Sequence, residues 1–208
     1  MTIDMQIRIG GAAGDGIESS GSGFCKALTR GGLYTFGLPD YYSRIRGGHN
    51  FFTVRVSDQP LYTHQATVHL LLALTQETLP RHRDIMAKDG LMVYDTALSI
   101  AKEDLEGNIE AIGIPMSDVA QDKAGTTLAR NTVALGFAAG VMGFDVSHLE
   151  GVIRENFQRK GQKIVDGNLA AVSWGYKEGQ KHAADFAYQA HAIPDAPQRM
   201  AIDGAEAF

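Results

Sequence analysis

The sequence predicts an α/β protein with an open, mostly parallel sheet and helices on both faces, a Rossmann-like architecture. Two observations lead to this prediction. Short strand-like runs alternate along the chain with longer stretches of helical spacing, as in proteins built from βαβ units. Several of these runs are continuously apolar, which is typical of parallel strands buried on both faces. With 44% hydrophobic residues in 208, the chain can bury a substantial core.

The first elements form a strand, a glycine loop, a helix and a second strand. Residues 5–9 alternate between apolar and polar side chains, which predicts a strand. A glycine-rich loop follows at 10–16, and helical spacing continues over 17–30. Two glycines end that helix before a strand-like run at 33–36. This order predicts a βαβ unit.

The rest of the chain continues the alternation. Further strands are expected at 51–56, 68–74, 90–95 and 109–115. Helices are expected at 76–87, 126–142, 147–158 and 162–189. Two prolines within four residues mark 191–199 as a linker, so we expect one domain over 1–190. Residues 200–208 resemble the start of a following element.

Composition excludes several classes of protein. A net charge of −5 and a pI of about 5.8 argue against a nucleic-acid-binding surface. The single cysteine, Cys25, excludes disulfide frameworks, zinc knuckles and iron–sulfur sites within this chain. The longest apolar stretches are too short to span a bilayer, and residues 1–5 lack the features of a secretory signal. We therefore expect a cytoplasmic protein.

Glycine is in excess: 24 of the 208 residues, or 11.5%, are glycine, against about 7% in average usage. The first glycine cluster is a candidate anion site. Backbone amides of Gly14, Asp15 and Gly16 could face a phosphate at the start of a helix. The third position of the dinucleotide fingerprint is Ser19, however, and no acid closes the second strand. Asp15 and Glu18 also resemble a capping box, which would place a carboxylate on the first-turn amides. The alternative is a tight turn that serves only close packing of helix and strand.

The second glycine cluster is the densest polar stretch of the chain. Its candidate binding residues are Ser43, Arg44, Arg46, Gly47, Gly48 and His49. Arginine forks match phosphate or carboxylate geometry, and glycines allow close approach of a ligand or partner. If the two clusters are neighbours, an arginine could offset the charge of Asp15. Alternatively, one arginine pairs with Asp15 or Asp40 and the other is solvated.

Two single polar residues complete the set of candidates. His49 before an apolar strand is more often a hydrogen-bonded structural histidine than a base, and no metal ligand stands beside it at suitable spacing. Asn131, in an otherwise apolar helix, is expected to cap or cross-link backbone, or to face a ligand cleft. No residue is assigned a catalytic or metal-binding role.

Both clusters together resemble the γ subunit or domain of the 2-oxoacid:ferredoxin oxidoreductases. The first matching run is Gly11-Ala-Ala-Gly14-Asp15-Gly16. The second is Tyr42 to Gly48, followed by Val54-Arg55-Val56-Ser57. The apolar run 71–74 and the helix from Asn131 to Gly136 also fit, so the resemblance covers about residues 6–188. Residues 200–208 resemble the opening of the family's α subunit, as in a γ–α fusion, and Arg46-Gly47-Gly48-His49 resembles the 2-oxoglutarate type.

The resemblance implies a function for the chain within a complex. These enzymes convert 2-oxoglutarate, coenzyme A and oxidised ferredoxin to succinyl-CoA, CO2 and reduced ferredoxin. Thiamine diphosphate, Mg and the iron–sulfur cluster are expected in the α and β portions, because this chain lacks an Asn-Asn pair and cysteine motifs. The two glycine clusters and Asn131 are expected to border the path of coenzyme A. The alternatives are a stand-alone dinucleotide-binding oxidoreductase using the first loop, and a purely structural docking module.

Overall fold

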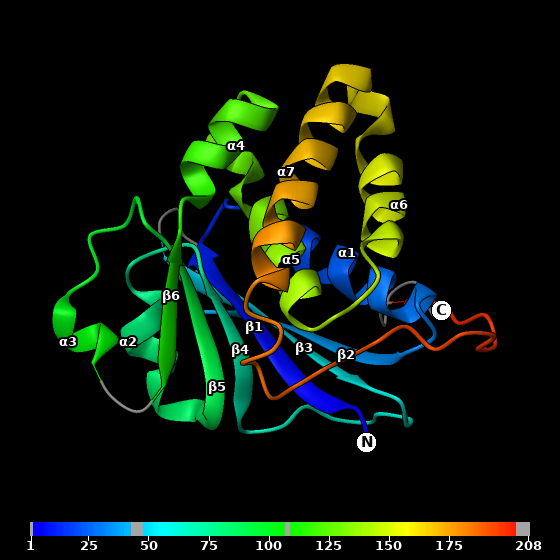
Figure 1. Cartoon of the computed structure of the whole chain (residues 1–208), viewed down its shortest axis with the longest axis horizontal. Helices are drawn as coiled ribbons and strands as arrows, with labels where there is room; N and C mark the ends of the chain where they lie inside the picture. Colours follow the sequence, from blue (N-terminus) through cyan, green and yellow to red (C-terminus); the bar gives the residue numbers. More distant parts are fainter. Residues whose placement is uncertain (1, 43–47, 107–108, 203–208) are drawn as a thin grey trace.

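A six-stranded sheet organises the chain in the computed structural model, which describes residues 2–42, 48–106 and 109–202 (Figure 1). The strand order is β2-β3-β1-β4-β5-β6. The strands are β1 (Asp4–Ala12), β2 (Tyr34–Tyr41), β3 (His49–Ser57), β4 (Val68–Ala73), β5 (Met86–Asp95) and β6 (Glu110–Ile114). All six predicted strands are therefore present.

Only β3 runs against the other described strands. It pairs antiparallel with both β1 and β2, whereas β1, β4, β5 and β6 form parallel pairs. The prediction of a mostly parallel α/β sheet is confirmed. The opening βαβ unit is modified, because β3 lies between β1 and β2 and keeps them from pairing.

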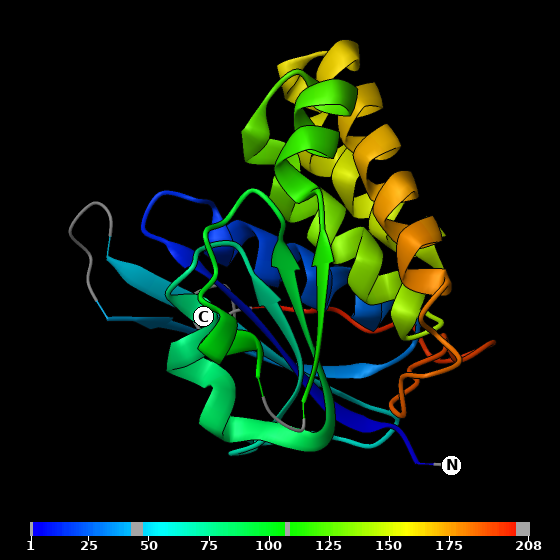
Figure 2. The ribbon, with the colours of Figure 1, turned by 60° about the vertical axis from the view of Figure 1, so that its left-hand side comes forward.

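Long helices cover one face of the sheet and short helices cover the other (Figure 2). The first set packs on the larger apolar core and comprises α1 (Ile17–Arg30), α4 (Met116–Ala124), α5 (Arg130–Val141), α6 (Val146–Phe157) and α7 (Gln162–Gln180). The second set comprises α2 (Thr78–His82) and α3 (Lys102–Leu105), beside a smaller core under β4 and β5. In the described part of the chain, no helix is long and apolar enough to cross a membrane.

Several predicted boundaries were wrong. In place of the helix expected at 76–87, the chain forms the short helix α2 and then a 3-10 turn (Arg83–Ile85). Met86 and Ala87 are instead the first, buried residues of β5. The helix expected at 162–189 ends at Gln180. Helices α3 (4 residues) and α4 (9 residues) were missed, because each offers too few turns for a clear apolar stripe.

Helices α5 and α7 approach each other unusually closely through four glycines. A Cβ atom at Gly136 would lie 2.3 Å from the Val172 carbonyl oxygen. The reverse contact is equally close, since a Cβ at Gly175 would lie 2.1 Å from the Val133 carbonyl oxygen. The other two glycines, one turn further along each helix, are Gly140 and Gly179. Part of the glycine excess therefore serves packing of one helix on another, which the sequence analysis did not foresee.

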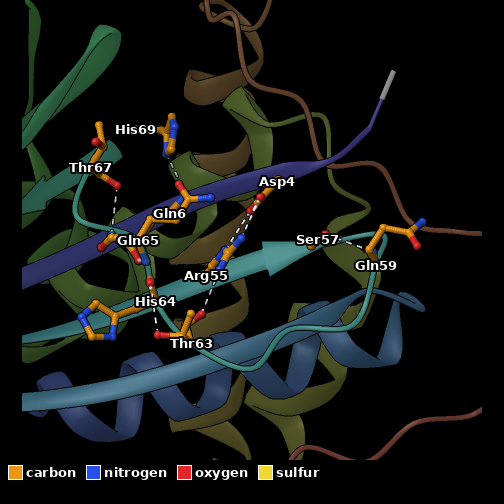
Figure 3. Close-up of polar contacts among 10 residues, drawn as sticks. All are labelled: Asp4, Gln6, Arg55, Ser57, Gln59, Thr63, His64, Gln65, Thr67 and His69. Atoms are coloured by element: carbon orange, nitrogen blue, oxygen red, sulfur yellow. Dashed lines mark hydrogen bonds and ion pairs between the residues drawn. The ribbon is translucent and has the colours of Figure 1, made fainter.

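On the opposite face, polar side chains of β1 are buried. The Gln6 side chain is fully buried, and its amide forms hydrogen bonds with the backbone of a loop (Figure 3). Its Nε2 donates to the carbonyl oxygens of Gln65 (2.8 Å) and Thr67 (3.0 Å), while its Oε1 accepts from the Gln65 amide (2.8 Å). The Arg55 guanidinium binds both carboxylate oxygens of Asp4 at 2.9 and 2.8 Å. The Gln6 contacts hold residues 65–67 against β1, and Arg55 Nη1 also donates to the Thr63 carbonyl oxygen at 3.1 Å.

Candidate functional site

The two glycine clusters meet at one edge of the sheet. Ala12 of β1 lies opposite His49 of β3, and the Ala13 amide donates to the Gly48 carbonyl oxygen at 2.8 Å. A hollow of about 360 Å³ between the loops is lined by Ala13, Gly14, Tyr41 and Asn50. This edge carries the carboxyl ends of β1, β2 and β4, where open α/β sheets usually bind ligands. The condition that the loops be neighbours is met.

Asp15 joins the first loop to helix α5. Its Oδ2 accepts from the Ala12 amide at 3.0 Å and from Arg130 Nη2 at 2.8 Å. Both side chains of this ion pair are mostly shielded, with 19% and 22% of their surface exposed. Arg130 therefore neutralises the carboxylate that would otherwise repel a phosphate at this loop.

The predicted capping box was wrong. Helix α1 begins after Gly16, which is left-handed (φ 72°, ψ 27°) and has no side-chain oxygen to accept from the first turn. The Asp15 carboxylate turns back to Ala12, and Glu18 Oε2 accepts from the Tyr41 hydroxyl at 2.6 Å. The first-turn amides of α1 consequently carry no side-chain cap.

Asn131 cross-links the first loop to α5, one of the roles expected for it. Its Nδ2 donates to the Asp15 carbonyl oxygen at 2.6 Å and to Ser20 Oγ at 3.1 Å. The side chain is only 7% exposed, and its Oδ1 has no hydrogen-bond partner among the described residues. Because Nδ2 already faces a carbonyl oxygen, exchanging the two amide atoms would set two oxygens against each other.

The structure describes only part of the second cluster. Ser43, Arg44, Arg46 and Gly47 lie outside the described residues. Gly48 is described and supplies the carbonyl oxygen that binds the first loop. Asp15, which one of those arginines was expected to pair with as an alternative, is bound by Arg130.

Around His49, the structure shows a buried polar cluster that the sequence analysis missed. His49 Nε2 lies 2.8 Å from His82 Nε2, and His82 Nδ1 lies 3.2 Å from Arg8 Nη1. Arg8 Nε donates to Thr53 Oγ1 at 3.0 Å, and its guanidinium lies 4.2 Å from the centre of the Phe51 ring. The polar alternation of β1 was the only signal for Arg8, while His82 stood alone in the sequence.

Burial controls the protonation of these histidines. His82 is 1% exposed and His49 is 5% exposed. Desolvation, followed by the positive charge of Arg8, lowers the pKa of His82 to about 3. Desolvation is also the main cause that lowers the pKa of His49, with Arg81 next. Both rings are therefore neutral at pH 7.

Residues 6–178 match the family model described as pyruvate ferredoxin/flavodoxin oxidoreductase. The chain belongs to this family. Subunit VorA of ketoisovalerate oxidoreductase from Methanothermobacter thermautotrophicus is 31% identical over 175 residues, which are 83% of this chain and 36% of VorA. Subunit KorC of 2-oxoglutarate synthase from Archaeoglobus fulgidus is 23% identical over 182 residues, 87% of this chain and 91% of KorC.

Solved structures of the family share the fold. A 2-oxoglutarate:ferredoxin oxidoreductase from Magnetococcus marinus, solved with 2-oxoglutarate, coenzyme A and succinyl-CoA bound, is 26% identical and superposes with a TM-score of 0.79. The match covers 95% of this chain and 34% of that one. The γ subunit of a keto/oxoacid ferredoxin oxidoreductase from Geobacter sulfurreducens gives 0.70 at 23% identity, over 85% of this chain and 99% of that one. The chain thus spans about a third of VorA and of the Magnetococcus protein, but nearly all of the γ subunits.

Thiamine diphosphate does not fit the first loop of this family member. A thiamine diphosphate site needs a free carboxylate for its metal, and the Asp15 carboxylate is engaged by Arg130 and Ala12. Among the described residues, no group of three His, Cys, Asp or Glu side chains could hold a metal ion. A dinucleotide fits poorly as well, because β3 separates the strand that ends in the glycine loop from β2.

Thiol chemistry is also not supported. Cys25 borders a cavity of about 830 Å³ between α1, β2 and α6. The thiol is 6% exposed, and burial raises its pKa to about 12. A thiolate nucleophile is therefore absent at neutral pH, and Cys25 packs as a small apolar residue.

Proposed function

We propose that this chain is the γ domain of a 2-oxoacid:ferredoxin oxidoreductase of the 2-oxoglutarate type, and that it forms part of the coenzyme A side of the active site. The reaction takes 2-oxoglutarate, coenzyme A and oxidised ferredoxin to succinyl-CoA, CO2 and reduced ferredoxin. The observation that carries this proposal is the joining of the two glycine loops by the Ala13–Gly48 hydrogen bond, in a chain similar to an oxidoreductase solved with coenzyme A bound.

The chemistry of the edge suits the phosphates of coenzyme A. The first-turn amides of α1 have no side-chain cap, and the helix N-terminus adds positive potential. The charge of Asp15 is already paired with Arg130. Arg44 or Arg46 would contribute the fork that binds a phosphate, next to the backbone of Gly47 and Gly48.

This chain is catalytically silent by itself under the proposal. Its described residues hold no group of three His, Cys, Asp or Glu side chains that could bind a metal ion, and burial raises the pKa of the Cys25 thiol to about 12. Thiamine diphosphate, Mg and the iron–sulfur cluster belong to the α and β portions, and ferredoxin is the acceptor of the complex. Residues 1–190 form the γ domain, 191–199 the linker, and 200–208 the start of an α-type domain, which accords with the greater length of VorA.

Charge reversal at Arg46 tests the role toward coenzyme A. In the assembled oxidoreductase, Arg46→Glu should raise the KM for coenzyme A at least tenfold, because a phosphate then faces a carboxylate. The KM for 2-oxoglutarate should change little. Arg159→Glu, an equal charge change in an exposed turn at the end of α6, is the matched control and should leave both values unchanged.

The same experiment separates the docking role from the ligand role. An unchanged KM for coenzyme A in an intact complex of Arg46→Glu would refute the contact with the ligand. If the variant instead fails to assemble, as judged by size-exclusion chromatography, the loop docks the domain. Saturable binding of NAD or FAD to the chain would favour the stand-alone dinucleotide enzyme.

A further inference from the structure

Three side chains from distant parts of the sequence form one directed hydrogen-bond chain behind the second loop. Arg8 lies on β1, His82 at the end of α2, and His49 at the start of β3. The chain runs from Arg8 Nη1 to His82 Nδ1 (3.2 Å) and from His82 Nε2 to His49 Nε2 (2.8 Å). Both imidazoles are almost completely buried, so water cannot rearrange these contacts freely.

Donor and acceptor roles along this chain follow from the guanidinium. Arginine has only N–H donors and stays protonated in proteins, so His82 Nδ1 must accept with its lone pair. His82 is therefore neutral and carries its proton on Nε2. That proton can be donated only to His49 Nε2, which must in turn be unprotonated. His49 is then the neutral tautomer with its proton on Nδ1.

We propose that His82 and Arg8 are positioning residues that lock His49 as a neutral Nδ1–H tautomer at the edge where the two glycine loops meet. This inference deepens the proposed function, and the role given to His49 at this edge rests on that function. His49 is neither a cation for a phosphate nor a general base, because its Nε2 lone pair is occupied. It is a fixed hydrogen-bond donor, and the positive charge toward coenzyme A must come from arginine.

The surroundings of the cluster favour the same protonation state. The Phe51 ring lies 4.7 Å from the His82 ring and 4.2 Å from the Arg8 guanidinium, and so excludes water from one side. The charges of Arg8 and Arg81 oppose a further cation on either histidine, whereas the charge of Glu77 acts the other way on His49. The Tyr42 ring packs 5.6 Å from the His49 ring.

Long-range proton–nitrogen NMR of the 208-residue chain, labelled with 15N-histidine, reads out each tautomer directly. The expected spectrum shows His82 protonated on Nε2 and His49 protonated on Nδ1, with the pKa of both rings below the ordinary histidine value. His49→Gln and His82→Gln assign the two sets of signals. A wild-type His49 protonated on Nε2, or titrating near its ordinary pKa, would overturn the proposal.

Variants at His82 distinguish positioning from mere packing. His82→Phe keeps the ring volume but removes both nitrogens, so His49 should lose its tautomer preference and titrate at higher pH. His82→Gln keeps an acceptor for Arg8 and a donor for His49, so it should preserve the Nδ1–H tautomer. His64→Gln, in an exposed loop, is the control. If His82→Phe leaves His49 as in the wild type, or if His82→Gln does not preserve its tautomer, His82 does not set it.

This test is independent of the kinetic one. A failure of the tautomer assignment leaves the effect of Arg46→Glu on the KM for coenzyme A untouched. Conversely, an unchanged KM in Arg46→Glu would refute the ligand role while the tautomer of His49 is still measured in the chain alone. Folding of each variant is checked by far-UV circular dichroism, and the wild-type spectrum decides the assignment even if His82→Phe does not fold.

Discussion

The two faces of the sheet bury different chemistry. On the face covered by α5 and α7, backbone meets backbone through Gly136, Gly140, Gly175 and Gly179, and the core is apolar (Figure 1). On the other face, β1 carries the buried Gln6, which holds a loop, and the half-buried Arg8, which contacts one of a pair of histidines. The first arrangement depends on the absence of side chains, whereas the second depends on the direction of each hydrogen bond. The helical face therefore stabilises the fold, and the polar face orients groups toward the edge with the two glycine loops.

The largest effect is expected where the helices touch. Gly175→Ala places a Cβ 2.1 Å from the Val133 carbonyl oxygen, so α5 and α7 must separate. We expect a loss of about 3 kcal/mol or more in the free energy of unfolding, measured by urea denaturation. Gly151→Ala is the matched control, since its Cβ would meet nothing closer than Arg30 Nη1 at 3.7 Å.

The control should move in the opposite direction. Gly151 lies inside α6, where alanine is the better helix former by about 0.5–1 kcal/mol. A Gly175→Ala variant as stable as the Gly151→Ala variant would show that the two helices can separate at little cost. The contrast between the two faces would then be lost.

On the polar face, a nearly isosteric change should be costly. Gln6→Glu at neutral pH replaces a donor by a carboxylate oxygen that faces the carbonyl oxygens of Gln65 and Thr67. We expect a loss of about 2–3 kcal/mol in the free energy of unfolding. Gln59→Glu makes the same change on an exposed side chain of the same loop (Figure 3) and should stay within about 0.5 kcal/mol. Equal effects of the two substitutions would contradict a role for the buried amide.

A smaller effect is expected from pH. The pKa values of His49, His69 and His82 are lowered in the folded chain, mainly by burial, so these rings are neutral where the unfolded chain binds protons. Because the unfolded state binds more protons below about pH 6.5, the free energy of unfolding should fall as pH decreases from 7 to 5. Each histidine contributes at most about 1.4 kcal/mol per pH unit.

A variant isolates the contribution of one ring. His82→Gln should make the decrease between pH 7 and 5 shallower, as measured by urea denaturation at each pH. The carboxylates with lowered pKa values, Asp4, Asp145 and Glu155, act mainly below pH 5 and do not interfere. A slope identical to that of the wild type would mean that folding does not lower the pKa of His82.

Strand positions and the two loops were predictable because their signals are local. Apolar runs marked β4 and β5, and glycine clusters marked both loops of the edge. The partner of Asp15 was not predictable, since Arg130 follows 115 residues later and no local pattern joins them. The same holds for His82, which lies 33 residues from His49 and 74 from Arg8.

By itself, the sequence determined the α/β class, the order of the strands along the chain, the two glycine clusters and the family resemblance. Each depends on residues close together in the chain, where periodicity and motif spacing carry the information. Tertiary structure alone decided that β3 separates β1 from β2, that four glycines pack two helices, and that Arg8 and His82 lie in line with His49. These features arise from contacts between distant segments, whose geometry exists only after the sheet has assembled.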